Sequence, residues 1–288
     1  MLDLLRSMRP KHWIKNVFVA APLVFARKLQ DPQAIANSIE AFLAYCLVAS
    51  SIYLLNDYID LDRDKGHPIK CKRALPSGRV STRSVIALAF TLLIASCLLS
   101  LLVNGRFRMV LGVYFLMNLA YSTFLKQRVI LDVMIIAVGF VLRVIAGSLA
   151  IAVAPSNWLL MCTFLLALFI GFGKRRHELL VLEGSAMEHR EVLSNYSPYF
   201  LDQMISVVTA STVMSYALYT ISPKTIAKFQ TESLIFTTPF VLYGIFRYLY
   251  LVHQEERGGD PASIVFSDKP LLVNILLWGI IVTALIYH

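Results

Sequence analysis

Long apolar stretches, separated by short polar segments, run along almost the whole chain. Most are about as long as the roughly 17–25 residues that an α-helix needs to cross the ~30 Å hydrocarbon core of a membrane. Apolar residues are continuous within them and do not alternate with polar ones, which disfavours a transmembrane β-barrel. The pattern predicts an all-α polytopic membrane protein with about nine transmembrane helices in one domain, 1–288. The expected spans are roughly 14–27, 34–55, 83–104, 108–125, 129–153, 157–173, 203–222, 233–252 and 270–287.

The composition agrees with this class of protein. Of the 288 residues, 57% are hydrophobic and 16% are charged, whereas soluble domains are about 25% charged. The first apolar stretch follows several basic residues and is not followed by a small-residue cleavage site, so we expect a retained first span and no cleaved signal peptide. The four cysteines show no metal-ligand spacing and are expected to be packing residues.

The net charge of +9 reflects membrane topology and does not call for a nucleic-acid partner. With the N-terminus placed in the cytoplasm, nineteen lysine and arginine residues fall in cytoplasmic segments and six in outside loops. This asymmetry predicts a cytoplasmic N-terminus. The two most charged loops, 56–82 and 174–202, then lie on the same, cytoplasmic side.

The stretch "SIYLLNDYIDLDRDKGHPIKCKRALPSG" (51–78) leaves an apolar span and places four aspartates within eight residues. If 50–65 is a helix, Asp57, Asp60 and Asp64 share one face, Asn56 lies beside that face and Asp62 points away. Carboxylates gathered in this way, with no cysteine or histidine among them, favour Mg²⁺. The alternative is a solvated charged loop with ordinary salt bridges.

A basic run follows the aspartates directly. Its members are His67, Lys70, Lys72, Arg73 and Arg79. Carboxylates can hold a metal ion while nearby cations bind the phosphate oxygens that the metal does not reach. The adjacent opposite charges therefore predict a site for a metal ion and a diphosphate.

This stretch resembles the signature N-D-x-x-D-x-x-x-D of the UbiA superfamily of intramembrane prenyltransferases. The matching residues are Asn56, Asp57, Asp60 and Asp64. "KRALPSGRVS" (72–81) resembles the family's R-P-x-x-S-G stretch, with Ala74 where proline is usual. "YSTFLK" (121–126) and "LDVMIIAVGFVLRVIAG" (131–147) resemble segments of the fourth and fifth helices. The resemblance implies a UbiA-type helical bundle, a cavity that faces the cytoplasm, and Mg²⁺ held by Asp57, Asp60 and Asp64 as catalytic residues.

One segment departs from the usual pattern of the superfamily. Members that use prenyl diphosphates carry a second aspartate-rich motif after the sixth span, whereas this chain has "GFGKRRHELLVLEG" (171–184). The basic residues Lys174, Arg175 and Arg176 predict an anion site there. Together with "RPKHWIKNVFVAAPL" (9–23) and "SDKPLLVNILLW" (267–278), the segment resembles the polyprenyl-phosphate phosphoribosyltransferases of the superfamily.

This resemblance implies the transfer of 5-phosphoribosyl from phosphoribosyl pyrophosphate to a polyprenyl phosphate of the decaprenyl type. Pyrophosphate is released, and the product supplies precursors of cell-envelope polysaccharides. The resemblance also implies a multi-pass protein of the bacterial cytoplasmic membrane, with its active site on the cytoplasmic side. Whether the chain forms a homo-oligomer is left open. The alternatives are a prenyl-diphosphate-dependent aromatic prenyltransferase and, from another class, a transporter or lipid-carrier channel.

Further candidates for substrate binding lie outside the two motifs. Lys126 is expected to bind a phosphate, and Lys15 is a second basic candidate. Asp132 could serve the site or form a local ion pair, and Tyr121 could contact substrate or anchor the chain at the interface. Arg143, in the middle of a span, belongs either to a buried structural pair or to the polar floor of the cavity.

Several other polar residues allow either a role in the site or an ordinary structural role. The pair of Asp268 and Lys269 could line the rim of the cavity. The charged residues of the second loop, His177, Glu178 and His189, could be ligands or solvated loop residues.

Overall fold

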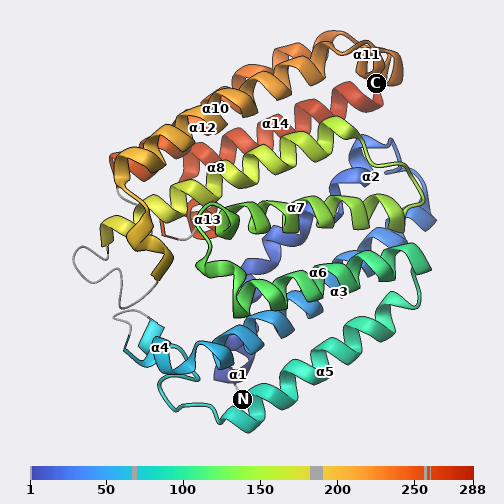
Figure 1. The fold of residues 1–288 in the computed structure, drawn as a ribbon. Helices are drawn as coiled ribbons and strands as arrows, with labels where there is room; N and C mark the ends of the chain where they lie inside the picture. The colour runs from blue at the N-terminus through green and yellow to red at the C-terminus, as the bar shows by residue number, and fades with distance from the viewer. Residues whose placement is uncertain (1, 67–69, 182–190, 256–257, 260) are drawn as a thin grey trace. The chain divides into compact units, whose positions relative to one another are not determined.

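The computed structural model describes residues 2–66, 70–181, 191–255, 258–259 and 261–288 (Figure 1). Every regular element in these ranges is a helix, which confirms the predicted all-α class. The chain divides into two compact units: residues 1–155 with 184–195, and residues 156–183 with 196–288. Two of the polar residues named from the sequence, His67 and His189, lie outside the described residues.

The first unit contains four long helices, which are α3 (Pro32–Ile59), α5 (Thr82–Ser100), α6 (Gly105–Thr123) and α7 (Leu131–Ala150). Figure 1 shows them side by side, and α3 packs against each of the other three. Shorter elements complete the unit: α1 (Leu2–Ser7), η1 (Pro10–Val19), α2 (Ala21–Phe25), α4 (Leu61–Lys65), η2 (Lys70–Lys72), η3 (Leu125–Gln127) and η4 (Glu191–Asn195).

Helix α3 is the centre of this unit because small residues allow close approach along its length. Ala41 and Ala44 are fully buried, as is Tyr45, whose ring packs against those of Phe107 and Tyr114 on α6. The helix begins at a strong start signal, where Asp31 accepts hydrogen bonds from the backbone N–H groups of Gln33 and Ala34. It ends where the acidic motif begins, so the packing of α3 fixes the position of that motif.

The predicted first span, 14–27, is not one continuous helix. It consists of the 3-10 helix η1 and the five-residue α2, which meet at Ala20. Pro22 lies in the first turn of α2, where proline favours a new helix start. Tertiary contacts hold the irregular segment: an ideal Cβ on Gly147 of α7 would lie only 1.8 Å from the backbone oxygen of Val19. Only glycine permits that approach.

The second unit contains α8 (Asn157–Val181), α10 (Pro198–Ile221), α12 (Thr238–His253) and α14 (Lys269–Tyr287). In Figure 1 consecutive members of this series lie beside one another. The short elements are α11 (Pro223–Phe229), η5 (Ser233–Thr237) and α13 (Pro261–Ser267). Helix α8 continues eight residues beyond the predicted span 157–173, so Lys174, Arg175 and Arg176 lie on a helix and not in a loop.

Among the described residues, seven helices are long and apolar enough to cross a membrane. They are α3, α5, α7, α8, α10, η5 with α12, and α14. Helix α6 corresponds to the predicted span 108–125 and ends at Thr123. It is also 19 residues long but is not among these seven helices. The pattern of apolar stretches thus located eight of the nine expected spans as helices, and 14–27 is the exception.

Candidate active site

The acidic motif is built by the end of α3 and the start of the next helix. The prediction of one helix over 50–65 is wrong, because α3 ends at Ile59, and α4 begins at Leu61 after a break at Asp60. Even so, the guanidinium nitrogen Nη1 of Arg73 lies 3.1 Å from Oδ1 of Asp57 and 2.7 Å from Oδ2 of Asp64. The carboxylates of Asp57 and Asp64 therefore converge on one point despite the break.

Arg9, which was not among the predicted site residues, is a member of this cluster. Its Nη2 donates a hydrogen bond to Oδ1 of Asp57, and its guanidinium lies 5.0 Å from the centre of the Tyr53 ring. Arg9 has a left-handed backbone, with φ 54°. No local pattern links Arg9 to Asp57, which is 48 residues away in the sequence, so the sequence offered no signal for this pair.

Asp60 faces a different cation. Nζ of Lys126, in η3, lies 2.5 Å from its Oδ1, and Nδ2 of Asn56 donates to its Oδ2 at 3.1 Å. Lys70 approaches Asp64, with Nζ 3.6 Å from Oδ1. The structure thus places seven of the predicted site residues in one charged cluster of the first unit, namely Asn56, Asp57, Asp60, Asp64, Lys70, Arg73 and Lys126.

The predicted set of three metal-binding aspartates is not assembled around one point here. Within the described ranges, no three aspartate, glutamate, histidine or cysteine side chains are close enough to hold a metal ion together. The pair of Asp57 and Asp64 does, however, share one positively charged nitrogen of Arg73. Hard oxygen ligands around one cationic position suit Mg²⁺, so the donor chemistry of this pair fits a divalent ion.

Arg143 forms a buried network within the first unit. Its guanidinium donates to Oδ1 of Asn16 at 2.8 Å, to the backbone oxygen of Gly139 at 3.0 Å and to the hydroxyl of Tyr114 at 2.6 Å. The group also lies 4.9 Å from the ring centre of Phe140. These contacts tie η1 to α6 and α7, which supports the structural interpretation of this mid-span arginine.

The three remaining candidates of the first unit lie on separate elements. Lys15 is half-buried in η1, and Tyr121 is half-buried in the last turn of α6. Asp132 is fully buried in the first turn of α7. A helix N-terminus favours a negative charge, so the position of Asp132 has a local physical reason of its own.

The basic triplet on α8 pairs with two carboxylates of the second unit, Glu178 and Asp202. Arg175 is only 2% exposed and forms an ion pair with Glu178. Arg176 donates from Nε to Oδ1 of Asp202 at 2.6 Å. Lys174 is the most exposed of the three, and its Nζ lies 3.7 Å from a carboxylate oxygen of Glu178. The predicted anion-binding side chains are therefore engaged with carboxylates in this structure.

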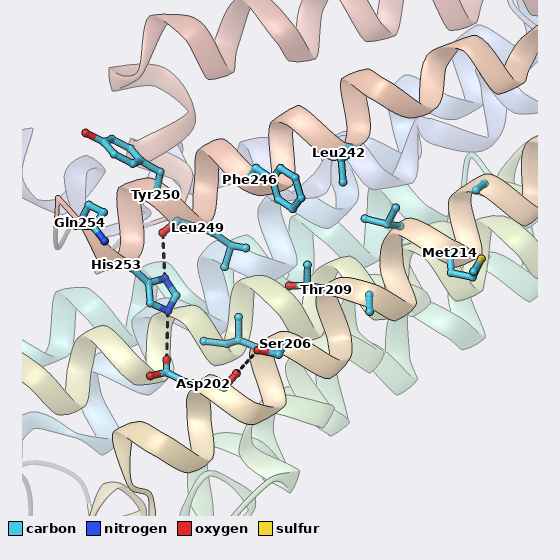
Figure 2. A pocket seen from close by; sticks show the side chains of 14 residues that line it. Asp202, Ser206, Thr209, Met214, Leu242, Phe246, Leu249, Tyr250, His253 and Gln254 are labelled. Carbon is cyan, nitrogen blue, oxygen red and sulfur yellow. Dashed lines mark hydrogen bonds and ion pairs between the residues drawn. The ribbon is translucent and has the colours of Figure 1, made fainter.

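Asp202 and His253 were missed by sequence reasoning. Nε2 of His253 lies 3.2 Å from the same Asp202 oxygen that accepts from Arg176. A groove with a volume of about 1070 Å³ lies between α10 and α12. Figure 2 shows His253 and Asp202 at one end of it. Gln254 lines the same end, whereas Leu242 and Met214 lie farther along it.

Two of the polar residues that the sequence left open, His177 and Asp268, have structural partners, and Lys269 is exposed. The Nδ1 atom of His177 accepts a hydrogen bond from the backbone N–H of Gly258 at 3.1 Å. Asp268 caps α14 through the N–H of Leu271 and pairs with the guanidinium of Arg247. Lys269 is exposed at the start of α14. The buried position of Asp268 favours a structural role.

Comparisons with known proteins agree with the geometry of the bundle. The profile of the UbiA prenyltransferase family matches residues 17–269. The decaprenyl-phosphate phosphoribosyltransferase of Corynebacterium glutamicum is 32% identical over 99% of this chain and 86% of its own length. The protein of the same name from Mycolicibacterium smegmatis is 31% identical over 99% of this chain and 92% of its own length.

A solved structure supports the fold independently of these sequences. A UbiA homologue from Archaeoglobus fulgidus, bound to GPP and Mg²⁺, superimposes with a TM-score of 0.75. The alignment covers 99% of this chain and all of that one, at 17% identity. This likeness confirms the predicted UbiA-type helical bundle.

Proposed function

From the premise that this chain belongs to the UbiA prenyltransferase family, we propose that it transfers 5-phosphoribosyl from phosphoribosyl pyrophosphate to a polyprenyl phosphate. Membership and the apolar helices make it a multi-pass integral membrane transferase. The observation that carries the finer proposal is the basic end of α8, where Lys174, Arg175 and Arg176 stand in place of a second acidic motif. The names of the relatives at about 30% identity support it.

The proposed donor matches the two kinds of charge in the chain. Its pyrophosphate is the leaving group and suits a divalent ion at the acidic motif. Its separate 5-phosphate, like the phosphate of the lipid acceptor, needs cations and no metal. A chain with one acidic motif and one basic segment therefore suits a reaction with three anionic groups better than one with a single prenyl diphosphate.

The proposed reaction exchanges one C–O bond for another at C1 of the ribose. The bond from C1 to the pyrophosphate oxygen breaks, and pyrophosphate leaves with the bonding electrons. A new bond forms between C1 and an oxygen of the lipid phosphate. This oxygen is already anionic, so no proton has to be removed and no general base is required.

The roles of the residues follow from this reaction. Asp57 and Asp64, with Asp60 nearby, would hold Mg²⁺, which when bound neutralises charge on the departing pyrophosphate. Lys70, Arg73 and Lys126 would contact phosphate oxygens from the basic side of the cluster. Catalysis would rest on positioning and on stabilisation of charge.

The groove between α10 and α12 offers a surface for a prenyl chain. Its polar side chains gather at one end, where Asp202 and His253 meet. Its other lining residues, such as Leu242 and Phe246, are mostly apolar. An amphipathic lipid with its prenyl chain along these apolar side chains would match this distribution.

The activity test uses membranes that contain the full-length protein. They are incubated with radiolabelled phosphoribosyl pyrophosphate, decaprenyl phosphate and Mg²⁺, and the lipid extract is analysed for label. We expect a labelled lipid phosphate that forms only when both substrates are present. Membranes without the protein are the control.

Two results would overturn the proposed function. Transfer from a prenyl diphosphate to an aromatic acid, with no labelled ribosyl lipid, would assign the protein to aromatic prenylation. Substrate flux across liposomes without any covalent product would assign it to transport.

A further inference from the structure

The acidic motif is already neutralised by cations of its own chain. Arg9 and Arg73 contact Asp57, Arg73 and Lys70 contact Asp64, and Lys126 contacts Asp60. The three carboxylates of the motif thus face four cationic side chains, so the cluster carries a small positive charge without any bound ion. A free divalent cation meets little net attraction there.

The arginines also cover the carboxylates that fit a metal ion. The side chains of Asp57 and Asp64 are only 7% and 4% exposed, whereas those of Arg9 and Arg73 are 21% and 33% exposed. A ligand that approaches from solvent therefore meets guanidinium groups before it meets carboxylates. That outer layer suits an anion, and the layer beneath it suits a cation.

We infer that the motif takes up its divalent ion together with a diphosphate anion, and that Arg9 then transfers from Asp57 to the diphosphate. This inference rests on the proposed function. It adds Arg9 to the residues that bind the diphosphate, and it states that the metal ion and the diphosphate bind together. The entry of a metal ion alone would leave two guanidinium groups beside a dication and without a carboxylate partner. A diphosphate that enters with the metal gives both groups new anionic partners, so the two ligands bind cooperatively.

The surroundings of Arg9 allow this exchange without unfolding the segment. The backbone next to Arg9 is held by α3, because the Ser50 hydroxyl donates to the Met8 oxygen at 2.9 Å and accepts from Nε1 of Trp13 at 3.0 Å. The guanidinium packs over the ring of Tyr53, 5.0 Å from its centre, and the face of an aromatic ring attracts a cation. Only the end of the Arg9 side chain has to move.

The test measures binding and not turnover. The full-length protein in nanodiscs is titrated with Mn²⁺ alone, and separately with a preformed Mn²⁺–pyrophosphate complex, while electron paramagnetic resonance reports free and bound metal. Wild type is compared with Arg9→Gln and with Arg6→Gln. Arg6 is a matched control from the same segment, because it pairs with Asp3 and is 71% exposed.

The inference predicts a crossover for Arg9→Gln. Removal of one competing cation should strengthen the binding of Mn²⁺ alone, and loss of an anion contact should weaken the binding of the complex. Each change should be about tenfold, within the usual range of coupling between two ligands. Arg6→Gln should behave as wild type, and Arg9→Lys should restore most of the wild-type pattern.

A purely structural role for Arg9 would weaken both kinds of binding, and no role would change neither. Either result in folded protein overturns the inference. If Arg9→Gln does not fold, Arg73→Gln, in the turn after η2, must give the same crossover, or the inference fails. A crossover without ribosyl transfer to lipid would refute only the proposed function, whereas ribosyl transfer without a crossover would refute only the inference.

Discussion

At the scale of single residues, two carboxylates of the acidic motif are buried and also have charged partners that a ligand could replace. Asp57 and Asp64 are buried, yet both remain beside charged partners that can be exchanged. A buried carboxylate without a partner is very costly. The arginines therefore keep the empty site stable and leave it ready for ligands that supply the same balance of charge.

Asp57→Asn should abolish most of the ribosyl transfer while the protein remains folded. The amide keeps the shape of the side chain but loses the negative charge that would hold Mg²⁺, so we expect transfer to fall about 10²-fold or more. Asp62→Asn is the matched control, since this side chain is 96% exposed and forms a surface ion pair with Lys65. Product formation is measured by the labelled-lipid assay at equal amounts of folded protein.

Equal loss of activity in both variants would mean that net charge, and not the position of Asp57, matters. Full activity of Asp57→Asn would remove this residue from the catalytic machinery.

Arg143→Leu should lower the thermal stability of the protein even without substrate. The change leaves Oδ1 of Asn16 and the Tyr114 hydroxyl buried without this partner, at a cost of about 1–3 kcal/mol for each group. Arg108→Leu, at an exposed position of α6, is the control and should change little. Thermal unfolding in detergent is the measurement. An unchanged midpoint together with lost substrate binding would instead favour the cavity-floor interpretation.

At the scale of elements, the irregular η1 segment depends on its neighbours. Its backbone passes directly over Gly147, and its Asn16 is fixed by Arg143 from α7. Irregular backbone at membrane depth is tolerated where protein buries it. The contacts of η1 with α7 therefore hold this broken segment in place within the first unit.

Gly147→Ala should strongly destabilise the first unit. The new Cβ would lie 1.8 Å from the Val19 oxygen, so the backbone of η1 or α7 would have to move, at a cost of about 1–3 kcal/mol or more. Gly112→Ala on α6 is the control, because nothing lies within 4 Å of a Cβ there. Folded yield and unfolding temperature are compared, and similar values for both variants would contradict the close contact.

At the scale of the whole molecule, the number of membrane crossings fixes the sides of the two termini. The ten residues of η1 and the five of α2 would extend about 20 Å and about 7 Å at the usual rises per residue. Their combined length is close to the ~30 Å hydrocarbon core. The broken segment can therefore still cross the membrane and keep the predicted odd number of crossings.

A C-terminal fusion tests this topology. We expect the N-terminus in the cytoplasm, as the distribution of basic residues predicts, and the C-terminus on the opposite side. A C-terminal alkaline phosphatase should then be active and a C-terminal green fluorescent protein dark, whereas green fluorescent protein inserted after Lys126 should fluoresce. A fluorescent C-terminal fusion would mean an even number of crossings, with 14–27 not spanning the membrane.

The sequence by itself determined the helical class, eight of the expected spans and the acidic motif, because these are written in local patterns. Continuous apolar stretches require helices that bury their backbone groups, and the acidic motif is written in the residues themselves, although the helix predicted for it is broken at Asp60. Tertiary structure alone decided the break within 14–27 and the partners of the charged residues. Arg9 meets Asp57, Lys126 meets Asp60 and Arg143 meets Asn16 across 48, 66 and 127 residues. Such pairs depend on how distant helices pack, and no local spacing records that.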